Sequence, residues 1–199
     1  MASQSITESP PCPNHNSHLY HFNELKLGDG SNEQQYFRAQ IFFRKKPKLT
    51  NEFFHEHWKS VHADLTMQVA DASSLLLRYE QFHQEPRHKT EIKRLLDISG
   101  GTMKSVPYDG CAVFHTKTAD DFIKFMENVY GSKKLVGCGT RFVDIIEGYD
   151  LMVGYVNLIL GPTIPGAGGD GIQVGDPRLI KTGSLEAERE HTCCGTTTG

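Results

Sequence analysis

Hydrophobic residues in the middle of the chain recur first with the period of a strand and then with that of a helix. Residues 36–44, YFRAQIFFR, alternate apolar and polar side chains over their first part, as a half-buried strand does. Residues 51–69 then have helical period, and Thr50 before them is a favourable N-cap. The predicted buried stripe of this helix consists of Phe54, Trp58, Val61 and Leu65.

The same change of period occurs again farther along the chain. Residues 75–83 and 110–115 each predict a strand, and residues 118–129 predict a helix that Thr118 caps. The predicted buried stripe of this second helix consists of Phe122, Phe125, Met126 and Val129. Further predicted elements are a short helix at 90–98, a fourth strand at 141–147 and an edge strand at 151–160. The order β-α-β-β-α-β predicts a ferredoxin-like α+β fold, an antiparallel sheet with both helices on one face.

The sheet face opposite the two helices has no predicted element to cover it. An apolar face of a sheet is normally buried against another layer of structure. Two copies of the chain, related by a two-fold axis, would supply that layer. The sequence therefore predicts a homodimer whose interface includes the helix-free face.

Strong periodicity is confined to the central part of the chain. Residues 1–34 are polar and rich in Pro, Asn, Ser and His, whereas residues 161–199 contain many Gly and Thr. We expect one domain over residues 35–160, flanked by a polar N-terminal extension and a Gly-rich C-terminal extension. The end of the latter, GSLEAEREHTCCGTTTG, has no apolar period, and we expect it to be disordered.

Composition and charge argue against several classes of protein. The net charge is −3 and no basic face stands out, so nucleic acid is not an expected partner. No apolar run reaches the ~18 residues that a transmembrane helix needs, and the N-terminus does not resemble a secretory signal. The five cysteines are odd in number and scattered, which favours reduced thiols. We expect a cytoplasmic protein with no membrane partner.

Three local patterns imitate cofactor sites. A cysteine and several histidines near the N-terminus lie in a polar segment without a second cluster, which argues against a metal. They are Cys12, His15, His18 and His21. The helix sequence HEHWKSVH has Lys59 where the zinc motif H-E-x-x-H requires its second histidine. GPTIPGAGGDG is not followed by the helix that a dinucleotide-binding loop requires. We therefore expect neither a metal nor an organic cofactor.

Several segments together resemble one protein family. FFRKKPKLTNEFFHEHWKSVH resembles the opening of EthD-like proteins, where a basic turn and a threonine cap lead into a helix of the form F-x-x-x-W-x-x-x-H. The matching residues are Phe54, Trp58 and His62. VPYDGCAVFHTKTADDF and TRFVDI resemble later strands of the family, so the resemblance covers about residues 36–148. It implies the dimeric α+β-barrel form of the ferredoxin-like fold, and the chain is similar to small fungal polyketide-tailoring dehydratases and decarboxylases.

His62 is the foremost candidate for acid–base chemistry. On a helical wheel it lies at the edge of the buried stripe, one turn after Trp58, so we expect it to face the cleft between helix and sheet. A neutral imidazole can take a proton from a carbon acid and return it to a leaving hydroxyl. A satisfied histidine at a packing interface is the alternative. His55 and His57 are expected to be more exposed to solvent, and His57 could reach Asp64 only across two turns.

The second strand supplies the other candidates. Leu77, Tyr79, Gln81 and His83 share one face by the period of two. If that face meets the helices, Tyr79 and His83 line the cleft, and the phenol can donate a hydrogen bond to an enolate oxygen. A tyrosine packed in the core is the alternative. We predict His62, Tyr79 and His83 as catalytic residues.

The remaining candidates would bind the substrate. Aromatic residues would form the apolar walls of the cleft, and a carboxylate among apolar neighbours is expected to be paired or perturbed. The predicted substrate-binding residues are Trp58, His55, Phe114, Phe142 and Asp144.

The residues and the resemblance together predict a cofactor-free lyase or cyclase. It would dehydrate, decarboxylate or close a ring in an aromatic or polyketide small molecule of secondary metabolism. The alternatives are a pericyclase-like protein that acts through shape alone, an oxygen-using relative, and a non-catalytic small-molecule-binding protein of the same fold.

Overall fold

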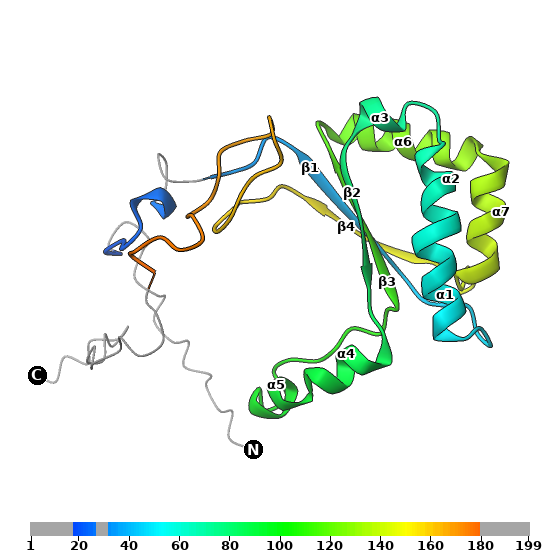
Figure 1. Ribbon diagram of the computed structural model, residues 1–199, viewed down its shortest axis with the longest axis horizontal. Helices are drawn as coiled ribbons and strands as arrows, with labels where there is room; N and C mark the ends of the chain where they lie inside the picture. Colours follow the sequence, from blue (N-terminus) through cyan, green and yellow to red (C-terminus); the bar gives the residue numbers. More distant parts are fainter. Residues whose placement is uncertain (1–17, 27–31, 180–199) are drawn as a thin grey trace, which may run out of the picture. The chain divides into compact units, whose positions relative to one another are not determined.

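The computed structural model describes residues 18–26 and 32–179, which belong to two compact units. The larger unit consists of Gln34–Val156 with Ile164–Ala167 and contains the sheet and all α-helices (Figure 1). In the smaller unit, which contains the 3-10 helix η2 (Asn23–Leu25), Arg178 forms ion pairs with Glu24 and Asp176. The domain boundaries predicted at residues 34 and 160 stay predictions. The disorder of the tail also stays a prediction, because the tail lies outside the described residues.

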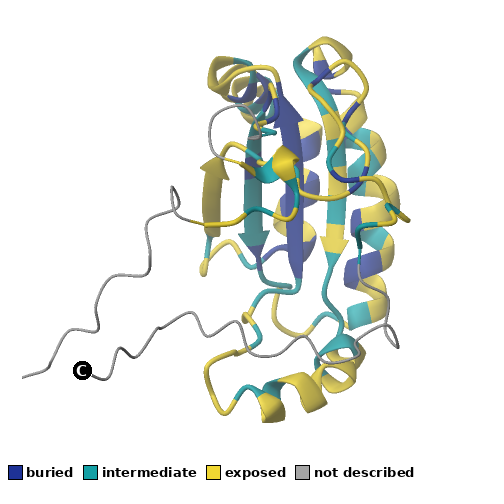
Figure 2. Ribbon diagram, turned by 90° about the vertical axis from the view of Figure 1, so that its left-hand side faces the viewer, coloured by how far each residue is buried: buried dark blue, intermediate teal, exposed yellow. Residues whose placement is uncertain are grey.

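A four-stranded antiparallel sheet is the framework of the larger unit. Its strands are β1 (Phe37–Phe43), β2 (Leu76–His83), β3 (Gly110–Thr116) and β4 (Tyr149–Gly154). They lie in the order β2-β3-β1-β4, and each neighbouring pair is antiparallel. The central strand β3 is buried at every position, as its dark blue colour shows in Figure 2. This order and direction are those of the ferredoxin-like α+β fold, and the predicted fold class is confirmed.

Helices cover one face of this sheet (Figure 1). A continuous helical segment follows β1, a helical pair follows β2, and two helices join β3 to β4. The helices are α1 (Asn51–His57), α2 (Ala63–Met67), α3 (Ala72–Leu75), α4 (Pro86–Glu91), α5 (Lys93–Ile98), α6 (Ala119–Gly131) and α7 (Lys133–Phe142), with the π-helical turn η3 (Trp58–His62) between α1 and α2. The short helix predicted at 90–98 is therefore a pair of helices that begins earlier, at a proline in the first turn.

The first helical segment begins as the sequence predicts and then departs from an ideal α-helix. The Thr50 hydroxyl accepts a hydrogen bond from the backbone of the first turn, 3.1 Å long, and Trp58 is fully buried. The π-helical turn η3 inserts one residue, which rotates the following side chains about the helix axis. Val61 is consequently exposed, contrary to the prediction, and Thr66 is buried while Leu65 is only partly buried.

The helix α6 agrees with the prediction. Thr118 and Asp121 form a reciprocal capping box at its start. Phe122 and Phe125 are buried, and the other two members of the predicted stripe pack against the same core.

The prediction of a strand over residues 141–147 was wrong. Ser132 caps α7, whose buried residues recur with helical spacing up to Phe142. The chain then turns at Asp144, whose carboxylate accepts a hydrogen bond from Ile146 N. The fourth strand is instead β4, which occupies part of the segment predicted as an edge strand and ends at Gly154. A short run such as RFVDIIE has the same apolar pattern whether it is a strand or the end of a helix with a turn, so periodicity could not distinguish them.

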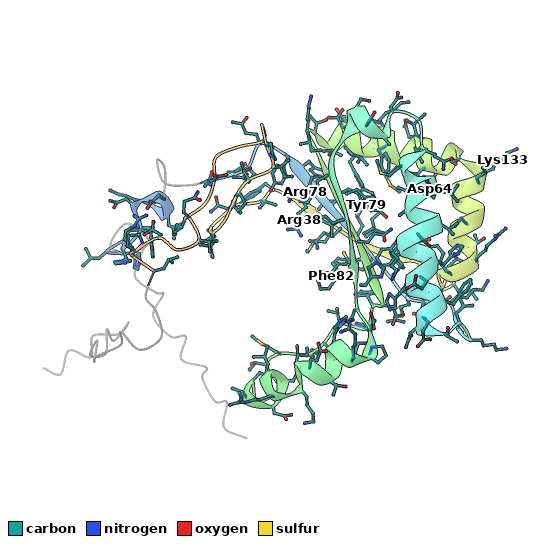
Figure 3. The ribbon with its side chains drawn as sticks, in the orientation of Figure 1. Arg38, Asp64, Arg78, Tyr79, Phe82 and Lys133 are labelled. Atoms are coloured by element: carbon teal, nitrogen blue, oxygen red, sulfur yellow. The ribbon has the colours of Figure 1, made fainter. Side chains whose placement is uncertain are left out.

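A bulge in β2 decides which side chains face the helices. The pairing of β2 with β3 shifts between Leu76 and Arg78. Leu77 therefore packs in a separate small cluster with Tyr36 and does not share a face with Tyr79, contrary to the prediction. Beyond the bulge, Tyr79 points toward the helices, whereas Arg78 and Phe82 point to the other side (Figure 3).

Candidate active site

A cavity of about 660 Å³ lies between the sheet and the helices. Its volume is within the usual range of small-molecule sites. Most of its lining is apolar, and the aromatic residues in it include Phe43, Trp58, Phe114, Phe125 and Phe142. The polar groups in the lining are His62, Thr66, Tyr79, Glu127, Tyr130, Thr140 and Tyr149. The arrangement suits an aromatic or otherwise largely apolar ligand with a small number of oxygen atoms.

The imidazole of His62 is brought into this cavity by the π-helical turn. His62 is the last residue of η3, and its side chain lines the cavity one turn before Thr66. The Thr66 hydroxyl donates a 2.7 Å hydrogen bond to the His62 carbonyl, which fixes the backbone at this point. The ring packs edge-to-face on Phe142, with ring centroids 4.9 Å apart. The Nδ1 atom of His62 is buried and has no hydrogen-bond partner within residues 18–26 and 32–179.

Burial determines the protonation state of this histidine. Desolvation, with a smaller contribution from the charge of His57, lowers the pKa of His62 from 6.5 to about 4. The ring is therefore neutral at pH 7, as the sequence led us to expect. A neutral imidazole with an unused buried nitrogen can accept a proton, and the imidazolium that results is a comparatively strong acid.

Tyr149 is a member of the cavity that sequence reasoning missed. A Cβ atom added to Gly139 would lie 3.9 Å from His62 Cε1 and 4.0 Å from the Tyr149 hydroxyl, so that both side chains converge beside the same glycine. Desolvation raises the pKa of the Tyr149 phenol, which therefore keeps its proton at pH 7. The signal was hidden because Tyr149 precedes the apolar run from which an edge strand was predicted.

Tyr79 lines the cavity from the sheet side, and a series of hydrogen-bonded side chains begins at its hydroxyl. The Gln81 amide donates a 2.8 Å hydrogen bond to the Tyr79 hydroxyl and a 3.1 Å hydrogen bond to the Trp58 carbonyl. The Gln81 carbonyl oxygen lies 3.3 Å from Nε2 of His83, and Nδ1 of His83 lies 2.8 Å from Nδ1 of His55. Four side chains thus connect the cavity to the end of β2.

The backbone carbonyl at Trp58 fixes the direction of this chain. A carbonyl only accepts, so the nitrogen of the Gln81 amide must face it and the amide oxygen must face His83. Nε2 of His83 then carries the hydrogen, its Nδ1 accepts, and His55 donates. Because the Tyr79 oxygen accepts from Gln81, its own O–H hydrogen is left to donate to Thr66 or to a ligand oxygen.

Desolvation acts on every member of the chain that titrates. It raises the pKa of Tyr79, and side-chain hydrogen bonds with Gln81, Trp58 and Thr66 oppose this effect. It lowers the pKa of His83 to about 4, to which the neighbouring His55 contributes, and it lowers the pKa of His55. The phenol is protonated and both imidazoles are neutral at pH 7, which is the state that the hydrogen-bond directions require.

His83 and His55 lie outside the cavity lining. The centroid of the His83 ring lies 4.2 Å from that of Trp58, with the two ring planes tilted by 41°. His55 is buried, which contradicts the expectation that it is exposed to solvent. The helix ends close to β2 here, and burial follows from that contact and could not be read from a helical wheel.

The other predicted residues take separate positions. Trp58, Phe114 and Phe142 line the cavity, and their contact with substrate stays a prediction. Asp144 is in the turn after α7 and does not line the cavity. His57 is partly buried and lies 3.1 Å from the Cys138 sulfur, not near Asp64, whose carboxylate accepts from Gln68.

Two further properties bear on possible cofactors and on membranes. Within the described residues no group of three or more His, Cys, Asp or Glu side chains is arranged to hold a metal ion. None of the helices found there is long and apolar enough to cross a membrane. Cys12 and His15, where the sequence argues against a metal site, lie outside the described residues.

Comparison with known families gives a match over half of the chain. The model of the family described as EthD domain matches residues 46–145. No curated protein matches the chain. A solved structure of a dimeric ferredoxin-like protein of unknown function from Thermobifida fusca is 11% identical, covers 62% of this chain and 91% of its own, and has a TM-score of 0.36. A solved structure of an EthD family protein from Bacillus halodurans is 13% identical, covers 60% of this chain and 96% of its own, and has a TM-score of 0.34.

Proposed function

The chain belongs to the EthD domain family, and from this premise we propose that its cavity is the active site of a cofactor-free lyase or cyclase. The substrate would be an aromatic or poly-keto small molecule of secondary metabolism. The observation that carries the proposal is the desolvated imidazole of His62, neutral at pH 7, in an apolar cavity that Tyr79 also lines. A base and a hydrogen-bond donor in one dry cavity are the minimum requirement for enolate chemistry.

Dehydration illustrates how the two groups would divide the work. His62 takes the proton from the carbon next to a carbonyl group, and the carbonyl oxygen becomes an enolate that the Tyr79 O–H stabilises. The electron pair then forms the carbon–carbon double bond as the bond to the β-hydroxyl breaks. The imidazolium returns its proton to that hydroxyl, which leaves as water. Tyr149 is positioned near His62 and can hydrogen-bond a second substrate oxygen.

The low pKa of His62 restricts the class of substrate. A base whose conjugate acid has a pKa of about 4 is weak, so the carbon acid must be strong. A carbon between two carbonyl groups, or one whose deprotonation makes a ring aromatic, meets this requirement. The same pKa makes the imidazolium an effective acid toward a leaving hydroxyl, which favours dehydration or ring closure with loss of water.

His83 and His55 act in this proposal as positioning residues. They do not line the cavity, but they orient Gln81, which directs the Tyr79 hydroxyl hydrogen toward the ligand. We expect their replacement to weaken catalysis less than the loss of His62 or Tyr79.

Hydrogen exchange tests the proposal without knowledge of the natural substrate. A panel of 1,3-dicarbonyl compounds and hydroxylated aromatic ketones is incubated with the protein in D₂O, and loss of the acidic C–H signal is followed by proton NMR. We expect the protein to accelerate exchange, with chelator present, and His62→Gln to abolish the acceleration. If the wild-type protein and His62→Gln exchange every bound compound at the same rate, His62 is not the base.

The apolar lining favours a second candidate, a pericyclase-like protein that acts by shape. It predicts product formation that survives His62→Gln. Binding of the panel without exchange or turnover would instead indicate a small-molecule-binding protein, and substrate-dependent oxygen consumption would indicate an oxygen-using relative.

We also infer that the protein is a homodimer. The sheet face without helices exposes large apolar side chains, among them Phe82 and Met152. Exposed apolar residues that are adjacent on a sheet face favour association.

A further inference from the structure

Three nitrogen-bearing side chains form one row across the helix-free face of the sheet. Arg38 on β1 and Arg78 on β2 are both register partners of His115 on β3. Adjacent strands are ~4.8 Å apart, so the backbones of the two arginines are about 10 Å apart with His115 between them. Figure 3 shows Arg38 and Arg78 on the same side of the sheet, opposite Tyr79.

Two nitrogen atoms of this row are buried without a hydrogen-bond partner among the described residues. Nε of Arg38 is buried without a hydrogen-bond partner in the described part of the chain, and so is Nδ1 of His115. The His115 side chain is 4% exposed, and its ring packs edge-to-face on Tyr36. No carboxylate of the described residues forms an ion pair with either arginine, whereas Arg44, just after β1, pairs with Glu147. Buried donors without acceptors are unfavourable, so an acceptor is expected here.

The charges of the row point to an anion. Glu80, in the next row of β2, places a carboxylate oxygen 3.9 Å from His115 Nδ1 and is half exposed. It offsets one of the two guanidinium charges, which leaves one positive charge. Desolvation, then the charge of Arg38, lowers the pKa of His115 to about 4, against the opposing effect of Glu80, so this ring is neutral at pH 7.

We propose that the row Arg38–His115–Arg78 binds an oxyanion, the carboxylate or phosphate group of a small molecule. The planar guanidinium presents paired N–H donors that match the two oxygens of a carboxylate or phosphate. His115 provides a ring nitrogen between the two guanidinium groups. None of the three residues lines the cavity on the other face, so this site does not depend on the function proposed for His62. The row lies on the face that we infer to be the dimer interface, four residues along β2 from Phe82, and the proposal places the bound oxyanion there in the dimer.

The probes are inorganic phosphate and benzoate, titrated at constant ionic strength maintained with sodium chloride. The signals of the His115 ring are followed by NMR in the full chain. We expect a saturable shift with at least one probe and a dissociation constant that Arg78→Gln raises at least ~10-fold. Arg78 is exposed, so this variant keeps the fold. Arg94→Gln, at an exposed arginine of α5 without an ion pair, is the matched control and should change nothing.

Glu80→Gln sharpens the test, because removal of a competing carboxylate should tighten binding several-fold, whereas a purely structural role of the row predicts no gain. Tighter phosphate binding identifies a phosphate ligand, and tighter benzoate binding identifies a carboxylate. The proposal is overturned if neither probe shifts His115 more in the wild-type chain than in Arg78→Gln. It is also overturned if Arg78→Gln converts a dimer to a monomer and neither probe binds, since the arginines would then pair with a second copy.

Discussion

The side-chain amide of Gln81 donates a 2.8 Å hydrogen bond to the hydroxyl oxygen of Tyr79. The same amide donates to the Trp58 carbonyl, so it cannot reverse without losing that bond. The relationship makes Tyr79 an acceptor toward the protein and a donor toward the cavity. Tyr79 and Gln81 are side by side because they are two positions apart on β2. The direction of the hydrogen bond between them is set by the Trp58 carbonyl, on the helical segment across the cavity.

Replacement of Tyr79 by Phe should lower kcat by about 10²-fold, because loss of one oxyanion donor typically has an effect of this size. KM should change little if the hydroxyl acts in the transition state. The assay is turnover of the compound that shows the fastest exchange. Tyr155→Phe removes a hydroxyl from an exposed tyrosine outside the cavity and serves as the control. Equal losses in both variants would assign the effect to general structural damage.

Replacement of His62 by Gln should lower kcat by about 10²–10⁴-fold, the usual contribution of a positioned general base. The amide retains hydrogen bonding but cannot transfer the proton. His57→Gln changes a histidine of the same helical segment that does not line the cavity, and its effect should be much smaller. Steady-state kinetics of the two variants measure this difference in kcat. Near-normal turnover by His62→Gln would favour the shape-only mechanism.

Stability should fall as the solution is acidified from pH 6.5 to about pH 4. Desolvation lowers the folded-state pKa of His62, His83 and His115 from 6.5 to about 4. The unfolded chain therefore binds more protons in this window, and the stabilisation, complete above pH 6.5, is lost as the pH falls toward 4. Urea unfolding at successive pH values measures it. His62→Gln should flatten the dependence, and a stability that rises on acidification would contradict the assignment.

Gly110→Ala should destabilise the fold by about 1–3 kcal/mol, the usual effect of overpacking. A Cβ atom at this position would lie 2.6 Å from Trp58 Cζ3, in the middle of the core. Gly137→Ala is the matched control, because its Cβ atom would meet nothing within 4 Å and alanine favours the helix α7. Chemical denaturation of both variants should give changes of opposite sign. Tolerance of alanine at Gly110 would mean that Trp58 can move.

Phe82→Glu should dissociate the homodimer. Phe82 is 67% exposed on the helix-free face, and a carboxylate there would be buried against the partner. Ile98→Glu, at a side chain of α5 that is 72% exposed, tests whether an added charge alone has this effect. Light scattering at micromolar concentration gives the mass of each variant. A wild-type monomer would refute the dimer directly.

The local pattern of the sequence determined most of the framework. Alternation identified β1, and the threonine caps at Thr50 and Thr118 located the starts of two helices. These features depend on neighbours a few residues away, so they can be read along the chain. The family motif also singled out Trp58 and His62, both of which line the cavity.

Tertiary structure decided the features that depend on distant contacts. The π-helical turn leaves Val61 exposed and buries Thr66, and no local signal in the sequence predicted it. The bulge in β2 moves Leu77 to the other face while Tyr79 stays toward the helices. α7 extends through the segment in which a strand was predicted.

The same distinction between sequence and tertiary structure applies to the chemistry of the site. The residue types of the site, a histidine one helical turn after a tryptophan and a tyrosine on the next strand, were determined by the sequence alone. Their burial, protonation states and hydrogen-bond directions were not, because these depend on which groups the fold brings within 3 Å and on how much water it removes. The carbonyl that orients Gln81 belongs to a residue 23 positions earlier in the chain, and only the packing of helix on sheet brings the two together.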